Sequence, residues 1–487
     1  MKFPAAAISL AISSLIFAVA SAQLHFRLRE TTTSSYLTKE EHWMNQTIDH
    51  FSPYDRREFL QRYYEYLDEF RSPDGPIFLK ICGESVCSGI SNDYIGVLAK
   101  KFGAAVVSLE HRYYGKSYPF GSFSTENLRY LSSKQALFDL ALFRQYYQES
   151  LNAKLNKSTD NPWFVFGISY AGAMSAWFRL KFPHLTCGSL ASSGVVLAVY
   201  NFTKFDEQVG ESAGPECKAV LQEITSLVEQ RLESNQKELK KLFNAPMVEK
   251  HVYPFLLIGL IPIKRRRLLV FSGRCSSDSG TFSYSYQMMA TYSKKAGEDL
   301  VEAYAKYVKE YYIDYIGVDV DTYDQQQLKK DKISSSSSSA RLWWFQVCTE
   351  VAYFQVAPAN DSIRSSKLDT RQVYIYYVPT AKRLPFLLIY HLDLCKKVFG
   401  DDLPGPDVNA TNLYYGGKDI AVPAYIIKCH NCGHGSDMRG CPQSRLVPKG
   451  DAKNCSSPDA VNKVRQNIIT YIDQWLSECQ FSGVSAM

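Results

Sequence analysis

The chain has 487 residues, of which 46% are hydrophobic, 14% aromatic and 21% charged. Such a composition can bury a large core, which excludes a disordered or low-complexity protein. The formal net charge of +6 is small for a chain of this length, so a nucleic-acid-binding surface is not expected. At about 150 residues per domain, the length fits roughly three domains or one large α/β domain that carries an insertion.

The first 22 residues have the pattern of a secretory signal peptide. Lys2 precedes an apolar stretch at about residues 5–20, and Ala20-Ser21-Ala22 is a small-x-small cleavage signature. The stretch is short and interrupted by serines, which favours a cleaved signal over a permanent membrane anchor. We expect a mature chain that starts near Gln23 and follows the secretory pathway to an extracellular, vacuolar or lysosomal compartment.

The cysteines and glycosylation sequons agree with this destination. Twelve cysteines, an even number, permit up to six disulfides in an oxidising compartment. Asn-x-Ser/Thr sequons begin at six positions, and those on the surface are acceptors for N-glycosylation. They are Asn45, Asn156, Asn201, Asn360, Asn409 and Asn454.

Apolar stretches bounded by turn residues alternate with helical patterns in residues 43–201, which we predict to be the first part of an α/β core. This alternation is typical of a parallel sheet built from βαβ units. The predicted helices are residues 93–101 and 134–150. The predicted buried strands are residues 75–81, 104–109, 163–166 and 189–196.

Residues 202–393 show mainly helical periodicity, as at residues 211–243 and 296–312, and we interpret them as an inserted helical cap domain. The serine run at residues 334–339 predicts a flexible surface loop. Apolar stretches at residues 252–263 and 373–390 could contact a membrane. Prolines and basic residues interrupt or flank them, which favours irregular insertions instead.

Residues 394–479 are predicted to complete the core. Ser457 and Pro458 are typical of a helix N-terminus. The helix that follows has one apolar face, which we expect to pack on the sheet. That face consists of Val461, Val464, Ile468, Ile472, Trp475 and Cys479.

Residues 167–172, Gly-Ile-Ser-Tyr-Ala-Gly, lie between an apolar strand and a helical stretch, which is the context of a nucleophile elbow. Ser169 is the predicted nucleophile, and Gly167 and Ala171 supply the small side chains that the turn requires. Because Ala171 replaces the glycine of the strict Gly-x-Ser-x-Gly pattern, an ordinary glycine-rich turn is the alternative. We expect the N–H of Tyr170 to be one oxyanion donor and Cys82-Gly83-Glu84 to supply the other.

In this arrangement an acid and then a histidine follow the serine along the chain. His434 lies between Gly433 and Gly435 after a strand-like stretch at residues 424–428, and we predict it to be the general base. His430, at the end of that stretch, is more typical of a structural histidine. The two histidines and four nearby cysteines also resemble a zinc knuckle, but disulfides are the better explanation in a secreted chain, and we expect no metal and no cofactor. The cysteines are Cys429, Cys432, Cys441 and Cys455.

Five strings carry a resemblance to a known family: His50-Phe51 and residues 110–115, 167–172, 343–350 and 429–441. Together they span about residues 43–479. They resemble the serine peptidase family of lysosomal Pro-Xaa carboxypeptidase, dipeptidyl peptidase II and thymus-specific serine protease, most closely its plant thymus-specific-protease-like members. The resemblance implies an α/β-hydrolase core, a helical cap over the site, and exopeptidase activity that prefers proline or small residues near the cleaved bond. By motif position, it makes Ser169 the nucleophile and His434 the general base.

Residues 110–115, Glu-His-Arg-Tyr-Tyr-Gly, could belong to the site, but we prefer to interpret them as a structural turn after a strand.

The segments 242–293 and 372–389 do not resemble the relatives. A third departure concerns the acid: relatives carry it in an Asn-Gly-x-x-Asp-Pro-Trp string, and here Asn412 to Ala421 runs almost directly into the next predicted strand. Asp419 is the nearest substitute, although a surface-turn aspartate is the preferred interpretation. Loss of the acid costs roughly 10⁴ in kcat, about 5.4 kcal/mol.

The favoured hypothesis is a serine exopeptidase of the secretory pathway, a carboxypeptidase or dipeptidyl peptidase that prefers proline and acts through an acyl-enzyme. The missing acid segment motivates an alternative, a catalytically impaired relative that binds a peptide or a partner without cutting it. A secreted esterase or lipase on the same core is a third hypothesis. The expected partners are peptide substrates, with no nucleic acid and no stable membrane span.

Overall fold

The computed structural model describes residues 35–243, 299–310, 324–333, 338–365, 390–420, 424–427, 434–441, 443 and 458–482. The predicted signal peptide lies outside these residues, as do the apolar stretch at residues 252–263 and nearly all of the stretch at residues 373–390. Most of the two segments that depart from the family pattern, His430, and three of the four cysteines near it also lie outside.

A six-stranded mixed sheet forms the centre of the core, with strand order β2-β3-β6-β4-β7-β8. Neighbours β6, β4, β7 and β8 run parallel to one another, whereas β2 and β3 join the edge as an antiparallel hairpin. The strands are β2 (His42–Thr47), β3 (Glu58–Tyr66), β4 (Ile77–Ile81), β6 (Ala105–Leu109), β7 (Trp163–Ile168) and β8 (Gly188–Ser192). All four predicted strands are confirmed, although β8 ends four residues earlier than expected. The parallel order with crossover helices is that of the predicted α/β-hydrolase core.

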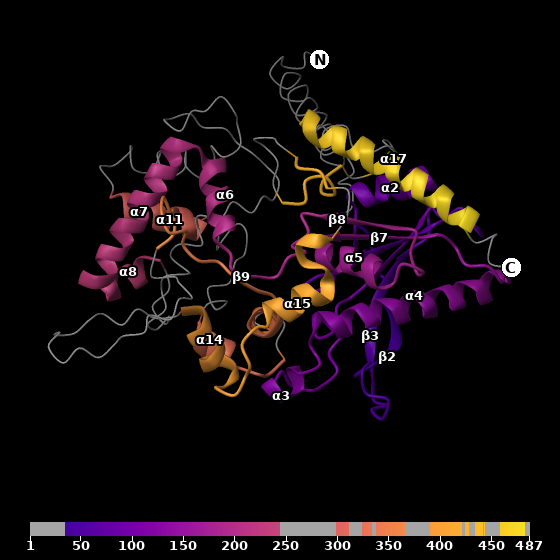
Figure 1. Ribbon diagram of the computed structural model, residues 1–487, viewed down its shortest axis with the longest axis horizontal. Helices are drawn as coiled ribbons and strands as arrows, with labels where there is room; N and C mark the ends of the chain where they lie inside the picture. The colour runs from indigo at the N-terminus through magenta and orange to yellow at the C-terminus, as the bar shows by residue number, and fades with distance from the viewer. Residues whose placement is uncertain are drawn as a thin grey trace, which may run out of the picture.

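Helices cover both faces of the sheet because alternate strand residues point to opposite sides. On one face, Leu79 and Val165 pack with α4 (Ser133–Leu155) and α5 (Tyr170–Lys181). On the other, Phe78 packs with α2 (Tyr94–Phe102) and α17 (Asp459–Ser482). Figure 1 shows α4 on one side of the strands and α2 with α17 on the other.

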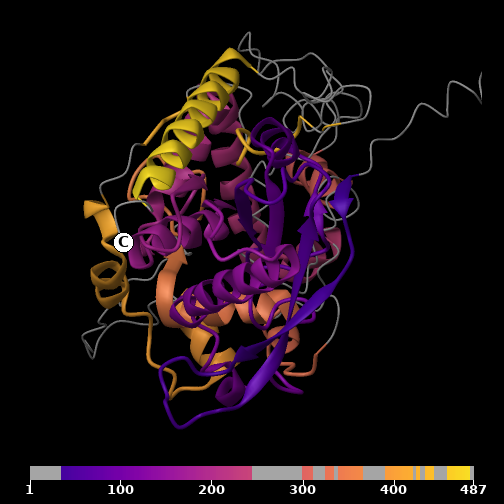
Figure 2. The same ribbon diagram turned by 90° about the vertical axis from the view of Figure 1, so that its right-hand side faces the viewer.

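The C-terminal helix α17 packs on the sheet as predicted. Its residues Ile468 and Ile472 are buried, and the Trp475 ring stacks on Phe164 with centroids 5.9 Å apart. A disulfide joins Cys479 to Cys187, the residue before β8. Figure 2 shows the yellow α17 on the left and the indigo N-terminal strands on the right.

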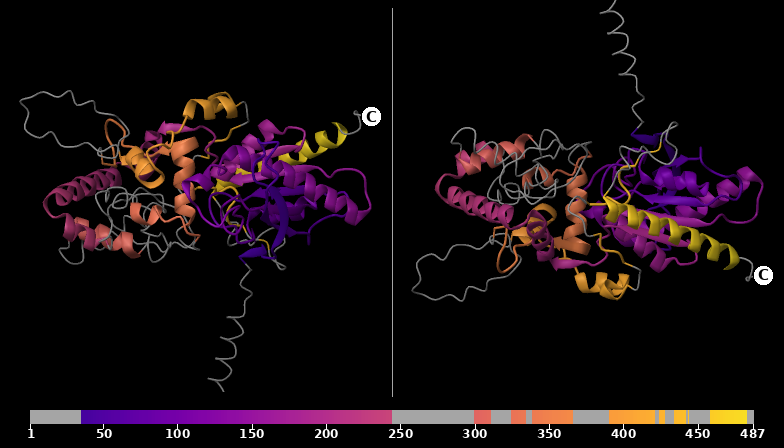
Figure 3. Two further views of the ribbon diagram at one scale, coloured as in Figure 1. Left: turned by 90° about the horizontal axis from the view of Figure 1, so that it is seen from below. Right: turned by 90° about the horizontal axis from the view of Figure 1, so that it is seen from above.

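The described residues of the predicted cap are mainly helical, as expected. They form α6 (Thr203–Ala213), α7 (Pro215–Ser234), α8 (Gln236–Leu242), α11 (Leu300–Tyr307), α12 (Gln325–Leu328), α13 (Ser338–Gln346), the π-helical turn η3 (Val347–Val351) and α14 (Tyr390–Phe399). One short parallel pair, β9 (Val199–Asn201) with β10 (Ala352–Phe354), was not predicted. These helices gather at one end of the molecule and the sheet lies at the other (Figure 3). The boundaries of the cap at residues 202 and 393 stay predictions.

The segment that returns to the core forms α15 (Val408–Tyr415) and the 3₁₀ turn η4 (Gly417–Asp419). Tyr415 stacks on Trp177 of α5 with ring centroids 4.0 Å apart, which fixes α15 on the core. The strand predicted at residues 424–428 is wrong for residues 424–427, which form no strand. Apolar residues alone did not suffice there, because a strand also needs a neighbour with which to pair. None of the described helices is long and apolar enough to cross a bilayer.

The Cys187–Cys479 disulfide is expected to stabilise the core strongly, because it closes a loop of 292 residues. Replacing both cysteines with serine should lower the free energy of unfolding by about 2–5 kcal/mol, measured by denaturant titration. The Cys348–Cys395 bond, with a sequence separation of 47, is the comparison, and its double serine variant should lose less. An unchanged free energy of unfolding in the first variant would contradict the prediction.

Candidate active site

Ser169 occupies the sharp turn between β7 and α5. Its φ of 65° and ψ of −126° lie in a region that side-chain-bearing residues rarely adopt. Two backbone hydrogen bonds hold Ser169 in this conformation. Its N–H donates to the carbonyl of Ser192 at 3.0 Å, and its carbonyl accepts from the N–H of Ala173 at 3.0 Å. The predicted elbow conformation is therefore present, and it places Ser169 beyond the carboxyl end of a central strand.

Small residues around Ser169 allow strand and helix to approach closely. A Cβ atom on Gly167 would lie 1.9 Å from the carbonyl oxygen of Ala171, and one on Gly172 would lie 2.9 Å from the carbonyl oxygen of Ser192. Both positions therefore exclude a side chain. Ala171 fits at its position, where its methyl group faces Gly83, so the missing glycine of the strict pattern does not prevent the turn.

Tyr170, the expected oxyanion donor, begins α5 directly after Ser169, and its side chain is buried in a polar network. The Nδ1 of His111 donates to the carbonyl of Arg112 at 2.9 Å, since a carbonyl can only accept. The Nε2 of His111 then accepts from the Tyr170 hydroxyl at 3.2 Å. Burial lowers the pKa of His111 to about 4, which keeps its imidazole neutral.

The network continues into the predicted cap. The Nε2 of Gln346, the last residue of α13, donates to the Tyr170 hydroxyl at 2.8 Å, and its Oε1 accepts from the Tyr114 hydroxyl at 2.8 Å. Four residues further on, the Glu350 carboxylate accepts the N–H of Ser133 at the start of α4, at 2.9 and 3.0 Å. Burial raises the pKa of Glu350 to about 7. Tyr170, the residue after the predicted nucleophile, is thus anchored both to the core and to the helices of the predicted cap.

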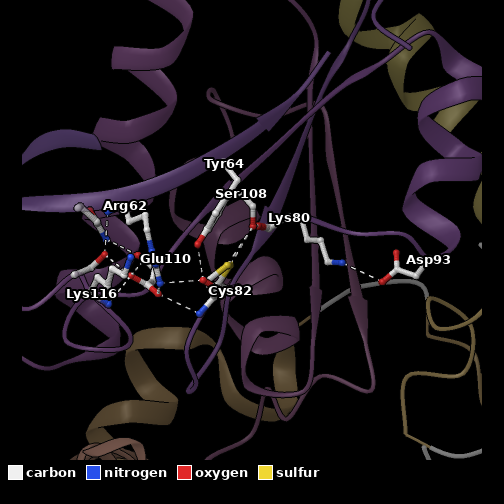
Figure 4. The surroundings of a disulfide bond; sticks show 11 residues. Arg62, Tyr64, Lys80, Cys82, Asp93, Ser108, Glu110 and Lys116 are labelled. Carbon is white, nitrogen blue, oxygen red and sulfur yellow. Dashed lines mark hydrogen bonds and ion pairs between the residues drawn. A yellow bond between two sulfur atoms is a disulfide. The ribbon is translucent and has the colours of Figure 1, made fainter. Parts of the chain in front are cut away.

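The loop expected to supply the second oxyanion donor lies beside the elbow. A Cβ atom on Gly83 would lie 3.5 Å from the Cβ and 3.7 Å from the backbone nitrogen of Ala171. A Cys82–Cys87 disulfide closes this loop. At its far end, the carbonyl of Cys87 accepts from the Tyr64 hydroxyl at 2.7 Å and from Arg62 at 2.9 Å, and its N–H donates to Glu110 at 3.1 Å. Figure 4 shows this anchor.

Residues 110–115 are a structural turn, as preferred from the sequence. The buried Glu110 carboxylate accepts hydrogen bonds from Arg62, Cys87, Lys116 and Ser117. Gly115 has a φ of +62°, and a Cβ there would overlap the Glu110 carboxylate at 1.8 Å. Through Glu110, the string holds the Cys82–Cys87 loop in place.

His434 begins a series of turns, residues 434–441, that packs against the ends of β7 and β8. The N–H of Gly435 donates to the Ser193 hydroxyl at 3.0 Å, and a Cβ on Gly435 would lie 2.7 Å from Ile168, the neighbour of Ser169. The fold thus brings the predicted nucleophile and base to one end of the sheet, although no hydrogen bond joins their side chains. His434 is exposed, but partial desolvation of its ring and the nearby Arg439 lower its pKa, while Asp437 opposes that shift.

The predicted substitute for the acid, Asp419, lies in the η4 turn and is exposed, as expected for a surface aspartate. Among the described residues, no carboxylate forms a hydrogen bond or an ion pair with His434. Cys441, one of the four cysteines of the zinc-knuckle interpretation, is in a disulfide and cannot act as a thiolate ligand. The other three lie outside the described residues.

Comparison with protein-family models gives one decisive match. Residues 46–426 match the model described as "Serine carboxypeptidase S28". The chain belongs to the S28 family of serine peptidases. It is therefore a serine-type hydrolase with peptide substrates. The matched region contains Ser169 and ends before His434.

Curated relatives in the S28 family support this placement. The chain is 52% identical over 481 residues to "Probable serine protease EDA2" of Arabidopsis thaliana, covering 92% of this chain and 91% of the relative. It is 30% identical to the human "Thymus-specific serine protease", covering 77% and 72% of the two chains. It is 35% identical over 176 residues to the bovine "Lysosomal Pro-X carboxypeptidase", covering 35% and 34%.

The sequence identified the elbow but missed His111, Gln346 and Glu350 as parts of its support. Gln346 and Glu350 lie inside the string at residues 343–350, so the resemblance marked the segment without giving a reason for it. A polar residue in an otherwise aromatic and apolar string was the available signal, because buried polar groups need partners.

The elbow geometry leads to a direct prediction for Gly167→Ala. The added methyl group collides with the Ala171 carbonyl, so the variant should lose about 1–3 kcal/mol of stability and its Ser169 should react more slowly with a fluorophosphonate probe. Gly121→Ala is the matched control, because Gly121 has open space around its Cβ position and no positive φ. Equal thermal stability and equal labelling of the two variants would contradict the prediction.

Proposed function

We propose that this S28 peptidase is a secretory-pathway exopeptidase, a carboxypeptidase or dipeptidyl peptidase, that prefers proline and acts through an acyl-enzyme on Ser169. The observation that carries the proposal is the elbow: Ser169 is held with φ of 65° at the start of α5, next to the N–H of Tyr170. The names of the bovine and human relatives, a Pro-X carboxypeptidase and a serine protease, support the substrate class. The predicted signal peptide and the disulfides support an extracellular, vacuolar or lysosomal location.

The reaction has two halves. His434 accepts the proton of the Ser169 hydroxyl while the oxygen attacks the scissile carbonyl, and the N–H of Tyr170 stabilises the oxyanion that forms. When this intermediate collapses, the C–N bond breaks, His434 returns its proton to the leaving amine, and an acyl-Ser169 ester remains. Water then releases the acid product by the same steps.

The exopeptidase part of the proposal follows from the cap. Two contacts support a cap near the elbow: Gln346, the last residue of α13, donates to the Tyr170 hydroxyl, and the hydroxyl of Tyr353 in β10 donates to the carbonyl of Val195, just after β8. A cap so close to the nucleophile favours chain ends over the middle of a long peptide. Either end of the peptide is compatible with this arrangement.

A catalytically impaired, peptide- or partner-binding role is the alternative. The specific observation in its favour is that, in the described part of the chain, His434 has no carboxylate partner at hydrogen-bonding distance. Loss of the acid from a triad lowers kcat by roughly 10⁴. Binding of prolyl peptides without turnover would distinguish this role from catalysis.

The first test is covalent labelling of the full chain, produced in a secretory host, with a fluorophosphonate probe. The reagent reports an activated serine without requiring the right peptide, so we expect labelling that Ser169→Ala abolishes. Ser477→Ala, an exposed serine on α17, is the matched control and should label like the wild type. Folded wild-type protein that stays unlabelled would favour the impaired relative.

The second test compares substrates. We expect cleavage of peptides with proline next to the scissile bond, lost when the responsible terminus is blocked by acetylation or amidation. Blocking only one end at a time identifies the end that is trimmed. Turnover of acyl esters without cleavage of any prolyl amide would instead support an esterase.

The pH dependence of labelling tests the role of His434. Because partial desolvation and Arg439 lower the pKa of His434 below its ordinary value of about 6.5, the neutral, base-competent form should already predominate at pH 6.5. The labelling rate should therefore rise with pH to a plateau, with a midpoint below pH 6.5. A midpoint at pH 8 or above would exclude His434 as the base.

A further inference from the structure

Two consecutive serines at the end of β8 connect the nucleophile to the His434 loop. The carbonyl of Ser192 accepts the N–H of Ser169 at 3.0 Å, while the Ser192 hydroxyl donates to Oδ1 of Asp437 at 2.5 Å. The hydroxyl of Ser193 accepts the N–H of Gly435 at 3.0 Å. Gly435 and Asp437 are the first and third residues after His434. The backbone of the nucleophile and the loop of the base are therefore attached to the same short segment.

The carboxylate of Asp437 is buried beside this segment, with 6% of the residue exposed. Its carboxylate accepts a hydrogen bond from the Ser192 hydroxyl, and within the described part of the chain no cation forms an ion pair with it. Arg465 of α17 approaches the same loop but donates to backbone carbonyls, at 2.9 Å to Asp437 and 2.8 Å to Arg439. The negative charge of Asp437 therefore acts on Arg465 as well as on His434.

Two charged groups of the described residues, Asp437 and Arg439, interact electrostatically with His434, and both belong to its own loop. From neighbouring elements, Glu84 of the oxyanion loop faces Arg439, and Arg465 of α17 faces Asp437. Partial desolvation and Arg439 favour the neutral imidazole, and Asp437 is the carboxylate that favours the protonated form.

We infer that Asp437 substitutes for the missing acid segment as a positioning residue. Held by Ser192, it fixes the loop that presents His434 and stabilises the imidazolium that forms when His434 takes the Ser169 proton. The inference rests on the proposed function. It requires no contact between Asp437 and substrate, since the positive charge develops on His434 and the carboxylate acts on that charge through space.

The test measures the second-order rate of fluorophosphonate labelling of Ser169 against pH. Asp437→Asn keeps an oxygen that can accept from the Ser192 hydroxyl but removes the negative charge. We expect its plateau rate to fall about 10–100-fold, part of the 10²–10⁴ that a general base contributes. Its midpoint should move to lower pH, because loss of a nearby negative charge lowers the pKa of His434. Asp473→Asn, on the exposed side of α17, is the matched control and should leave rate and midpoint unchanged.

A second variant separates the effect of the Ser192–Asp437 hydrogen bond from the effect of the negative charge on Asp437. Ser192→Ala breaks the bond to Asp437 but leaves every charge in place, so its plateau rate should fall while its midpoint stays near that of the wild type. Thermal unfolding checks that each variant is folded, and if Asp437→Asn does not fold, Ser192→Ala decides.

Three outcomes would overturn the inference. In the first, Asp437→Asn retains the wild-type rate and midpoint. In the second, Asp437→Asn loses rate with no shift in midpoint, which marks a purely structural residue. In the third, Ser192→Ala labels like the wild type. Each leaves the proposed function standing as long as the wild type labels at Ser169, whereas an unlabelled, folded wild type overturns both.

Discussion

The hydrogen bond from the N–H of Ser169 to the carbonyl of Ser192 is the constraint on which the site depends. It holds the first residue beyond β7 against the last residue of β8, and α5 must then start within the turn. Only small residues tolerate that crowding, as the positions of Gly167 and Gly172 show. A strained Ser169 is the consequence, and the energy that sustains the strain comes from the buried β7–α5–β8 core around it.

A second layer of order comes from the residue after the nucleophile. Tyr170 supplies a backbone N–H to the site, and its side chain is fixed by His111 in the core and by Gln346 in the cap. An oxyanion donor is effective when it is held in place before the reaction. The helix α13, which begins more than 160 residues later in the chain, therefore contributes to the geometry of the elbow through Gln346.

Only those parts of this arrangement that depend on residues close together in the chain could be predicted from the sequence. The apolar run of β7 followed by Gly167 and the small residues after Ser169 predicted the elbow, because strand, turn and helix propensities act over a few residues. The hairpin β2–β3 was missed because its polar residues, such as Gln46 and Gln61, are buried against each other at 2.9 Å, which hides the alternation of a surface strand. The partners of Tyr170 were also missed, since they lie 59 and 176 residues away. Asp437 was visible only as the third residue after His434, and its bond to Ser192 spans 245 residues.

The chain lacks the segment that carries the catalytic acid in the family pattern, and this loss lowers only part of the catalytic rate enhancement. In a serine triad, the acid contributes roughly 10⁴ to kcat, and the oxyanion hole with substrate binding contributes a further 10³–10⁴ that survives the loss of any triad residue. In this chain the elbow, the Tyr170 N–H and the disulfide-closed loop beside Ala171 are all in place. With His434 as the proposed base, the missing segment removes support for a positive charge on its imidazole, which partial desolvation and Arg439 already disfavour. We infer that the rate of this enzyme depends on how far one buried carboxylate, Asp437, offsets those two effects.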